Sequence, residues 1–275
     1  MCENYRDEIS SILLDCGLNH FGFCPFSAVS ESLIPLYSTK RLPAAPATII
    51  SFVFPLRRPE DVRRNVARYA TVTDYHLVVE ALLAPAVERL TARFPDHSFV
   101  PFCDVSPLPE VRTAAMAGLG VIGQHNLLIT KEFGSWVALG ELVTDLALPV
   151  MPRTIQPCKN CGACTARCPT GVLSGPFDRE RCLAGVTQRK KQPDAAMEAA
   201  LKQEKIAWGC DRCQEVCPMN RGTAFSNVAL FYEDVHPVIT ADNYGTLKNR
   251  VFFWRGEAVF LRNLGIIEDG EEHTM

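Results

Sequence analysis

Cysteine is the residue type in this sequence whose spacing most directly implies chemistry, with 12 cysteines in 275 residues. Four of them form the run C-x2-C-x2-C-x3-C followed by proline, which is the spacing that holds a cubane [4Fe–4S] cluster. The run consists of Cys158, Cys161, Cys164 and Cys168. A second, partial run also ends in a proline and consists of Cys210, Cys213 and Cys217. We therefore expect two [4Fe–4S] clusters in one small module.

The ligand sets follow from a rule of two-cluster modules, in which the fourth cysteine of each run binds the other cluster. One cluster would use the first three cysteines of the full run together with Cys217. The other would use Cys210, Cys213 and Cys168, and Cys182 is the candidate for its fourth thiolate. The remaining cysteines are not expected to bind iron: Cys2, Cys16, Cys24 and Cys103. A zinc ribbon is the alternative, but its paired C-x2-C ligands would leave the third cysteine of the first run unused.

The composition is that of a chain with a large buried core, since 47% of its residues are hydrophobic. No apolar run approaches the roughly 20 residues that span a bilayer, and the polar N-terminus is unlike a secretory signal. Without export, many cysteines favour metal chemistry in a reducing compartment over disulfides. We therefore expect a cytoplasmic protein with no membrane partner. A formal net charge of −3 provides no global attraction to nucleic acid, although a local basic patch is compatible with it.

Helical and strand patterns alternate over the first 150 residues, which predicts an α/β or α+β sheet domain. Helices are expected over 3–17, 74–94 and 110–117, and strands over 47–54, 98–100, 121–129 and 136–148. Pro85 should kink or split the second helix. The inward-facing residues of that helix are expected to be Leu77, Val78, Ala81, Leu82, Val87 and Leu90.

Prolines at positions 149, 152 and 157 predict a domain boundary near residue 150. The following module, residues 151–225, would be organised by the two clusters rather than by a large apolar core. It contains one further expected helix, over 194–205. Residues 226–275 are expected to form a C-terminal segment that packs back on the core.

Glycine-rich nucleotide motifs do not explain the N-terminal domain. Residues 118–123 contain the glycines of a G-x-G-x-x-G pattern, but they follow a helix and precede a strand, which is the reverse of a dinucleotide site. A nicotinamide site is therefore unsupported, and electrons from the clusters must pass to something else.

Several segments together resemble the epoxyqueuosine reductase family, which are cobalamin-dependent double-cluster enzymes of tRNA queuosine synthesis. These segments are 67–70, 74–76, 103–107, 117–126, 134–136, 139–141, 158–171 and 209–220. Reductive dehalogenases share the cluster signature, but the Asp-Tyr-His and Gly-Leu-Gly segments favour the former family. A dehalogenase precursor would also carry a twin-arginine signal, which this sequence lacks.

The resemblance implies an α+β fold, with a nitroreductase-like cobalamin-binding sheet domain over residues 1–150 followed by a bacterial-ferredoxin-like two-cluster module. Cobalamin (B12) would bind with its base off the cobalt. The implied corrin contacts are Asp74, Tyr75, Asn126, Ser135, Thr187 and Gln188. The family's catalytic aspartate, in an Asp-x-x-Pro setting, corresponds to Asp104, which would protonate the substrate as the epoxide oxygen leaves. A turn residue is the alternative reading of Asp104, and neither His76 nor His125 is assigned as a cobalt ligand.

The implied activity is the reductive removal of an epoxide oxygen, in tRNA queuosine synthesis or on a related substrate. The implied partners are tRNA and a reduced ferredoxin or flavodoxin as electron donor. The family continues into a helical-repeat domain thought to help hold tRNA, whereas this sequence stops at Met275, so weaker tRNA binding is expected. The alternative is an electron-transfer or cobalamin-handling iron–sulfur protein without a tRNA substrate.

Overall fold

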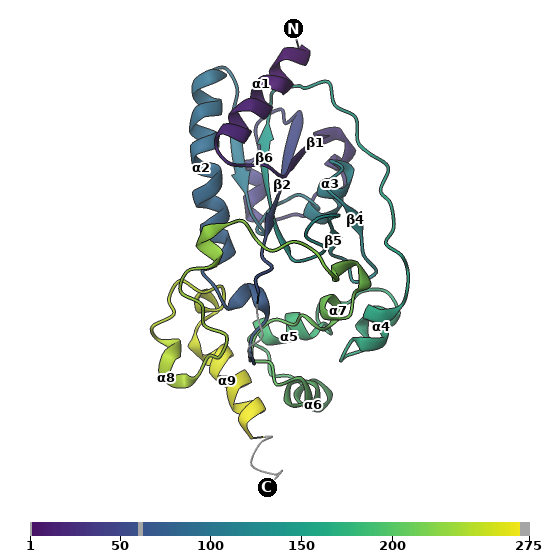
Figure 1. Cartoon of the computed structure of the whole chain (residues 1–275), viewed down its shortest axis with the longest axis vertical. Coiled ribbons are helices and arrows are strands. Elements are labelled where there is room, and N and C mark those ends of the chain that lie inside the picture. Colours follow the sequence, from purple (N-terminus) through teal and green to yellow (C-terminus); the bar gives the residue numbers. More distant parts are fainter. Residues whose placement is uncertain (1, 60–62, 270–275) are drawn as a thin grey trace. The chain divides into compact units, whose positions relative to one another are not determined.

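The computed structural model describes residues 2–59 and 63–269, and the chain forms two compact units (Figure 1). Unit 1 consists of Met1–Pro55 and His76–Lys159, and unit 2 consists of Leu56–Tyr75 and Asn160–Met275. Helices and strands are both present, so the predicted mixed fold is confirmed at that level. The domain boundaries placed at residues 150 and 225 stay predictions.

Unit 1 is built on a four-stranded antiparallel sheet with the order β1-β2-β6-β3, of which β1, β2 and β6 are labelled in Figure 1. Its strands are β1 (Phe21–Pro25), β2 (Thr48–Pro55), β6 (Val137–Thr144) and β3 (Phe99–Phe102). Every residue of β2 is buried, because this strand lies inside the sheet and is covered on both faces. The buried strand predicted over 47–54 is thus confirmed.

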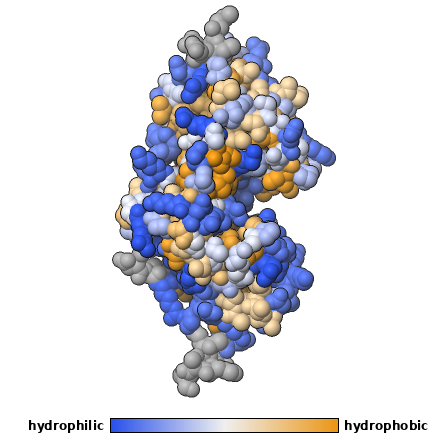
Figure 2. Space-filling model, turned by 90° about the vertical axis from the view of Figure 1, so that its right-hand side faces the viewer, coloured by the Kyte–Doolittle hydropathy of each residue, from blue (hydrophilic) through white to orange (hydrophobic). Residues whose placement is uncertain are grey.

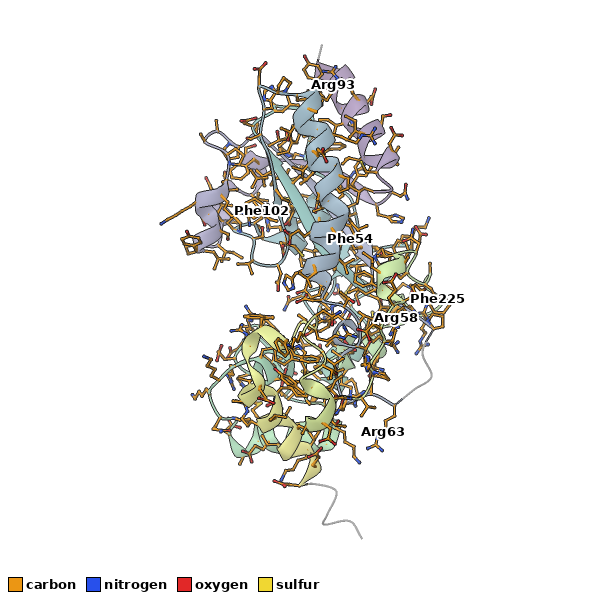
Figure 3. All side chains as sticks on the ribbon, turned by 90° about the vertical axis from the view of Figure 1, so that its left-hand side faces the viewer. Phe54, Arg58, Arg63, Arg93, Phe102 and Phe225 are labelled. Carbon is orange, nitrogen blue, oxygen red and sulfur yellow. The ribbon has the colours of Figure 1, made fainter. Side chains whose placement is uncertain are left out.

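Helices cover both faces of this sheet. On one face, α2 (Tyr75–Arg93) lies so close to β6 that a Cβ atom on Gly140 would come within 2.8 Å of Val79 Cγ1. Phe54, labelled in Figure 3, lies at the same place beside α2. On the other face, α3 (Glu110–Met116) packs against β1, β2 and β6. The first helix, α1 (Cys2–Asp15), lies beside the C-terminal end of α2, where the rings of Tyr5 and Phe94 are 5.4 Å apart.

The helix predicted over 74–94 is confirmed, and it is not split at Pro85, but part of the predicted inward face was wrong. The helix runs unbroken through Pro85, whose side chain is exposed. Leu77 is 50% exposed, and Ala81 also faces solvent. Val78 and Leu90 are buried as predicted, and together with Val79, Leu83 and Ala86 they form the buried stripe. Only this stripe faces the sheet, and hydrophobicity alone does not identify it in a helix that is apolar on several sides.

The single strand predicted over 121–129 was also wrong. The segment forms two short paired strands, β4 (Val121–Ile122) and β5 (Leu128–Ile129). Between them the chain turns at Asn126, which has a φ of +62°. Asparagine tolerates this left-handed conformation better than most residues, and one such residue is enough to reverse the chain.

Unit 2 is largely helical. Its helices are α4 (Ala163–Arg167), α5 (Leu183–Gln188), α6 (Ala195–Glu204), α7 (Arg212–Glu215), α8 (Ala241–Tyr244) and α9 (Glu257–Glu268). The predicted helix over 194–205 is confirmed as α6, which begins where the Asp194 carboxylate accepts a hydrogen bond from the Met197 N–H.

Unit 2 contains an apolar core of its own. Trp208, Phe252 and Phe260 are each at most 1% exposed and lie at its centre. Helix α9 contacts both α5 and α6, so the C-terminal segment packs on this core. The expectation that residues 151–225 lack a large apolar core was therefore wrong. Residues 239–267, distant in sequence, supply nine of the 19 buried side chains of this core, and a window confined to the cysteine runs misses them.

The surface is mixed in character. On the face drawn in Figure 2, hydrophilic side chains surround smaller hydrophobic areas on each unit, in agreement with a chain in which 21% of residues are charged. Among the helices of residues 2–59 and 63–269, none combines the length and hydropathy needed to cross a bilayer.

Candidate functional site

Asp104 lies just beyond the end of β3, in a turn that exposes its side chain. Its backbone has a φ of +56°, a left-handed conformation that costs free energy in most residues but less in aspartate. Its Oδ2 atom is 3.2 Å from Nε2 of His76, in the first turn of α2. The side chain of Asp104 is 57% exposed. Asp104 is therefore fixed in place while remaining accessible, as a proton donor to a bound substrate requires.

Two glutamates lie behind Asp104 that sequence reasoning missed. The Asp104 N–H donates a hydrogen bond of 2.9 Å to Oε1 of Glu110, at the start of α3. Glu141 lies opposite both Ser51 and Phe102 in the sheet, is fully buried, and is an acidic neighbour of Glu110. The detectable signal was a lone acidic residue within the apolar run of β6, because such a residue is almost never buried without a specific partner.

These two carboxyl groups retain protons unusually well. Burial, followed by the negative charge of Asp104, raises the pKa of Glu110 to about 7. Burial, followed by the charge of Glu110, raises the pKa of Glu141 well above its ordinary range. The Ser106 hydroxyl is a further neighbour of Glu141, yet no described donor reaches either Glu141 oxygen in hydrogen-bonding geometry. A hydrogen bond between the two carboxyls thus needs a proton on one of them.

Asn126 and Ser135, both expected corrin contacts, lie in unit 1 on either side of the strand β5. Asn126 is exposed at the β4–β5 turn, and Ser135 is buried. Next to Asn126, burial lowers the pKa of His125 to about 4, so its imidazole is neutral at physiological pH. Its Nδ1 accepts a hydrogen bond from the Leu127 N–H. The proton is therefore on Nε2, a buried donor that reaches no acceptor among the described residues.

The other expected corrin contacts lie in unit 2, and the structure brings two of them together through a residue that the sequence did not single out. The Tyr75 ring lies 6.0 Å from the ring of Tyr69. The hydroxyl of Tyr69 accepts a hydrogen bond of 3.3 Å from the Gln188 amide. Asp74 is 9% exposed. Thr187 is fully buried, and its hydroxyl bonds the N–H of Gly209 and the carbonyl of Ala184.

Four of the eight expected cluster ligands influence one another's ionisation, although the described residues include no group of three or more histidine, cysteine, aspartate or glutamate side chains arranged to hold a metal ion. Burial raises the pKa of the Cys213 thiol, and the nearby Cys210, Cys182 and Cys168 raise it further. These four residues are the ligand set inferred from the sequence for the second cluster. Partly buried thiols that repel one another when ionised are suited to a polynuclear cation, whose positive charge stabilises all four thiolates.

The other expected ligand set consists of Cys158, Cys161, Cys164 and Cys217, which are divided between the two units. Cys161, Cys164 and Cys217 all belong to unit 2, and Cys164 and Cys217 are buried. Cys158 lies at the end of unit 1, where its N–H donates to the carbonyl of Ile122.

An ion-pair network that sequence reasoning missed ties together the segments that carry the cysteines. The Glu204 carboxylate, 3% exposed, accepts two hydrogen bonds from Arg167, of 2.7 and 2.8 Å. Arg212 also bonds this carboxylate. Arg167 ends α4, next to Cys168, and Arg212 begins α7, next to Cys213. A buried carboxylate shared by two guanidinium groups keeps these helix ends at a defined separation.

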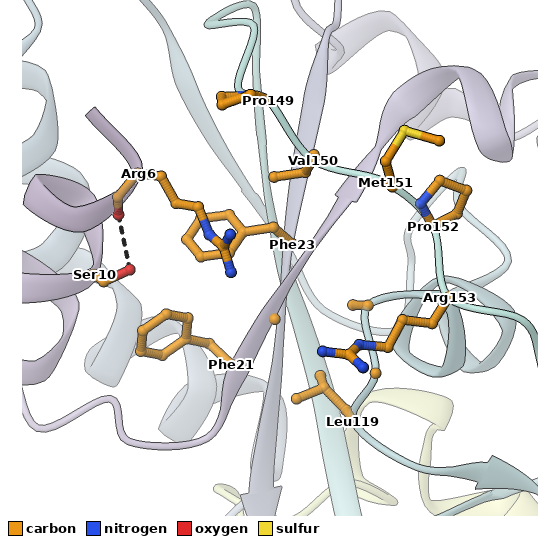
Figure 4. A pocket seen from close by; sticks show the side chains of 13 residues that line it. Arg6, Ser10, Phe21, Phe23, Leu119, Pro149, Val150, Met151, Pro152 and Arg153 are labelled. Atoms are coloured by element: carbon orange, nitrogen blue, oxygen red, sulfur yellow. Dashed lines mark hydrogen bonds between the residues drawn. The ribbon is translucent and has the colours of Figure 1, made fainter. Parts of the chain in front are cut away.

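Unit 1 also has a cavity of about 670 Å³ between α1, β1 and residues 149–153 (Figure 4). Arg6 and Arg153 extend over it, and Phe21 and Phe23 line its floor. None of the residues that the sequence assigned to chemistry lines this cavity, which is therefore separate from the Asp104 site.

Both the cysteine-rich region and most of the chain resemble known proteins. Residues 157–220 match the family model of a 4Fe–4S double cluster binding domain. Epoxyqueuosine reductase of Aliivibrio fischeri is 33% identical over 201 residues, which cover 72% of this chain and 52% of that protein. The chain thus spans about half the length of the curated relatives it matches.

Two solved structures share the fold. The epoxyqueuosine reductase of Streptococcus thermophilus has a TM-score of 0.81 at 24% identity, covering 98% of this chain and 82% of that one. An epoxyqueuosine reductase solved with an epoxyqueuosine-modified tRNA-Tyr stem loop has a TM-score of 0.82 at 23% identity, covering 100% and 83%. The resemblance drawn from the motifs is confirmed: this chain is a relative of the epoxyqueuosine reductases and contains a 4Fe–4S double cluster binding domain.

Proposed function

We propose that this chain is an iron–sulfur and cobalamin-dependent reductase that removes the epoxide oxygen of epoxyqueuosine in tRNA. The observation that carries the proposal is the placement of Asp104, an exposed acid held by His76 and Glu110, in a chain with a double-cluster domain. A simple electron carrier has no need of such a residue. A tRNA substrate would place the enzyme in the cytoplasm.

The cysteines would hold both clusters in crossed sets. Cys168, Cys182, Cys210 and Cys213 would bind one cluster, and Cys158, Cys161, Cys164 and Cys217 would bind the other. A reduced ferredoxin or flavodoxin would supply the electrons from outside.

Cobalamin would bind to the domain over residues 1–150, which we propose is nitroreductase-like, with contacts from the cluster side. The proposed contacts are Asp74, Tyr75, Asn126, Ser135, Thr187 and Gln188. The fit rests on His125, whose buried Nε2–H lacks an acceptor among the described residues and adjoins Asn126. An amide-rich corrin periphery would provide one. When bound, the corrin supplies a low-valent metal centre able to reduce a carbon–oxygen bond.

The proposed reaction converts the epoxide to an alkene. Both carbon–oxygen bonds of the epoxide break, a carbon–carbon double bond forms, and the oxygen leaves as water after taking up two protons and two electrons. Asp104 would donate a proton to the departing oxygen, because an unprotonated alkoxide is a poor leaving group. Its exposure would also allow it to regain a proton from solvent.

Turnover of the loaded protein tests this function. After anaerobic reconstitution with iron, sulfide and cobalamin, we expect queuosine to form from an epoxyqueuosine-modified tRNA stem loop when reductant is supplied. Affinity for the stem loop should fall linearly on a log–log scale with salt, because binding releases counterions from the phosphates. Intact clusters and cobalamin without any queuosine would reject this substrate and favour the electron-transfer alternative.

Cobalamin binding is a separate expectation. Titration of the cluster-loaded protein should give a base-off absorption spectrum, and Tyr75→Ala should weaken binding about tenfold, the effect of losing roughly 1.4 kcal/mol. Tyr37→Ala is the matched control, because Tyr37 is 83% exposed and outside the proposed contacts. Equal affinities in both variants would remove Tyr75 from the site, and no binding in the parent protein would remove cobalamin.

A further inference from the structure

We propose that Glu110 is a positioning residue for Asp104. A proton shared between Glu110 and Glu141 determines how strongly Glu110 accepts the hydrogen bond from the Asp104 N–H. This inference rests on the proposed function, in which Asp104 is the acid. It adds that the positioning of Asp104 by Glu110 depends on pH. The geometry consists of the 2.9 Å hydrogen bond from the Asp104 N–H to Glu110 Oε1 and the fully buried carboxyl of Glu141 behind it.

The hydrogen bond to Glu110 matters because Asp104 occupies a left-handed backbone conformation. An isolated turn would relax to other conformations at little cost, so an acceptor for the N–H of this residue is needed to retain it. The side chain of Asp104 is also bound to His76. The two contacts together determine both the backbone and the side-chain orientation of the acid.

The strength of the hydrogen bond between the Asp104 N–H and Glu110 depends on the charge of Glu110. An ionised carboxylate accepts a shorter and stronger hydrogen bond than a neutral carboxyl. When the pair carries one proton, Glu141 can donate it to Glu110, which then faces Asp104 as an anion. When the pair carries two protons, Glu110 is a neutral and weaker acceptor. When it carries none, the negative charges of the partly buried Glu110 and the fully buried Glu141 repel each other and the arrangement is lost.

Few other titratable groups influence the protonation of Glu110 and Glu141. The titratable groups that act on Glu110 are Asp104, His76 and Glu141. Of the strands against which α3 packs, β1 contributes Cys24, a thiol that stays neutral because burial raises its pKa to about 11. With the pKa of Glu110 raised to about 7, the single-proton state forms as the pH rises through neutrality. The hydrogen bond from the Asp104 N–H to Glu110 should strengthen over the same pH range.

Hydrogen exchange at the Asp104 amide tests this directly in the cluster-loaded protein. We expect its protection factor to rise about tenfold between about pH 6 and pH 8, the difference between a neutral and a charge-assisted hydrogen bond. Glu110→Gln keeps an acceptor oxygen but cannot ionise, so its protection should stay at the low value. Glu141→Gln donates permanently to Glu110, as protonated Glu141 does in this range, so its protection should rise with pH as in the parent protein. Glu88→Gln, an exposed residue of α2, is the control and should behave as the parent protein.

Turnover provides a second readout. The ratio of kcat between the parent protein and Glu110→Gln should be near one at about pH 6 and about ten at pH 8, while KM stays constant. Parallel loss of protection in both glutamine variants, without any pH dependence, would reduce the pair to a packing role and overturn the proposal. Exchange needs no substrate, so this failure is distinct from a failure of the proposed function, which appears as the absence of queuosine formation by the loaded parent protein.

Discussion

Asp104→Asn is expected to lower kcat by about 10²- to 10⁴-fold, the usual effect of removing a general acid. Asparagine is isosteric with aspartate, so it can keep the contact with His76 and the backbone hydrogen bond to Glu110. It tolerates a positive φ as well as aspartate does. The variant should therefore fold, bind cobalamin and hold its iron as the parent protein does, and differ only in its ability to supply a proton.

The measurement is single-turnover formation of queuosine at fixed pH, with iron and cobalamin quantified in the same sample. Asp96→Asn is a suitable control, since Asp96 is an exposed aspartate of the same unit with no assigned role. Turnover of the Asp104 variant within a factor of a few of the parent would assign the proton to another group. His76, 3.2 Å away, would then be the first residue to examine.

Cys182→Ala is expected to halve the iron content, from about eight atoms per chain to about four. Cys182 is the one expected ligand outside both cysteine runs, and its charge helps to raise the pKa of the Cys210 and Cys213 thiols. Three thiolates hold a cubane poorly, so this cluster should be lost while the other is retained. Electron transfer through the module should fail with it.

Iron and sulfide analysis after anaerobic reconstitution, together with electron paramagnetic resonance of the reduced protein, would measure this effect. Cys16→Ala is the matched control, because Cys16 follows α1 in unit 1 and is not an expected ligand. Loss of all iron would mean that the two clusters depend on each other for assembly. Retention of all iron would exclude Cys182 and leave the ligand set incomplete.

Much of the chemistry could be read from the sequence because it depends on local spacing. The separations within Cys158–Cys168 and Cys210–Cys217 are set by the distance that a few residues can span around a cubane, whatever the rest of the fold. The same holds for the helix over 194–205, whose N-cap aspartate and periodicity act within a few turns. The Asp-x-x-Pro segment at Asp104 is equally local, and its likeness to a family was sufficient to single it out.

Tertiary structure alone decided which distant residues meet. Glu110 and Glu141 are 31 positions apart, and nothing local indicates that α3 places one over the other on β6. The apolar core of unit 2 likewise joins residues near 200 to residues near 260, which is why the sequence suggested a module organised by its clusters alone. Burial raises the pKa of a carboxyl only after the chain has folded around it. The sequence by itself therefore predicted the metal-binding residues and the candidate acid, whereas only the folded chain determined the proton-retaining pair behind that acid.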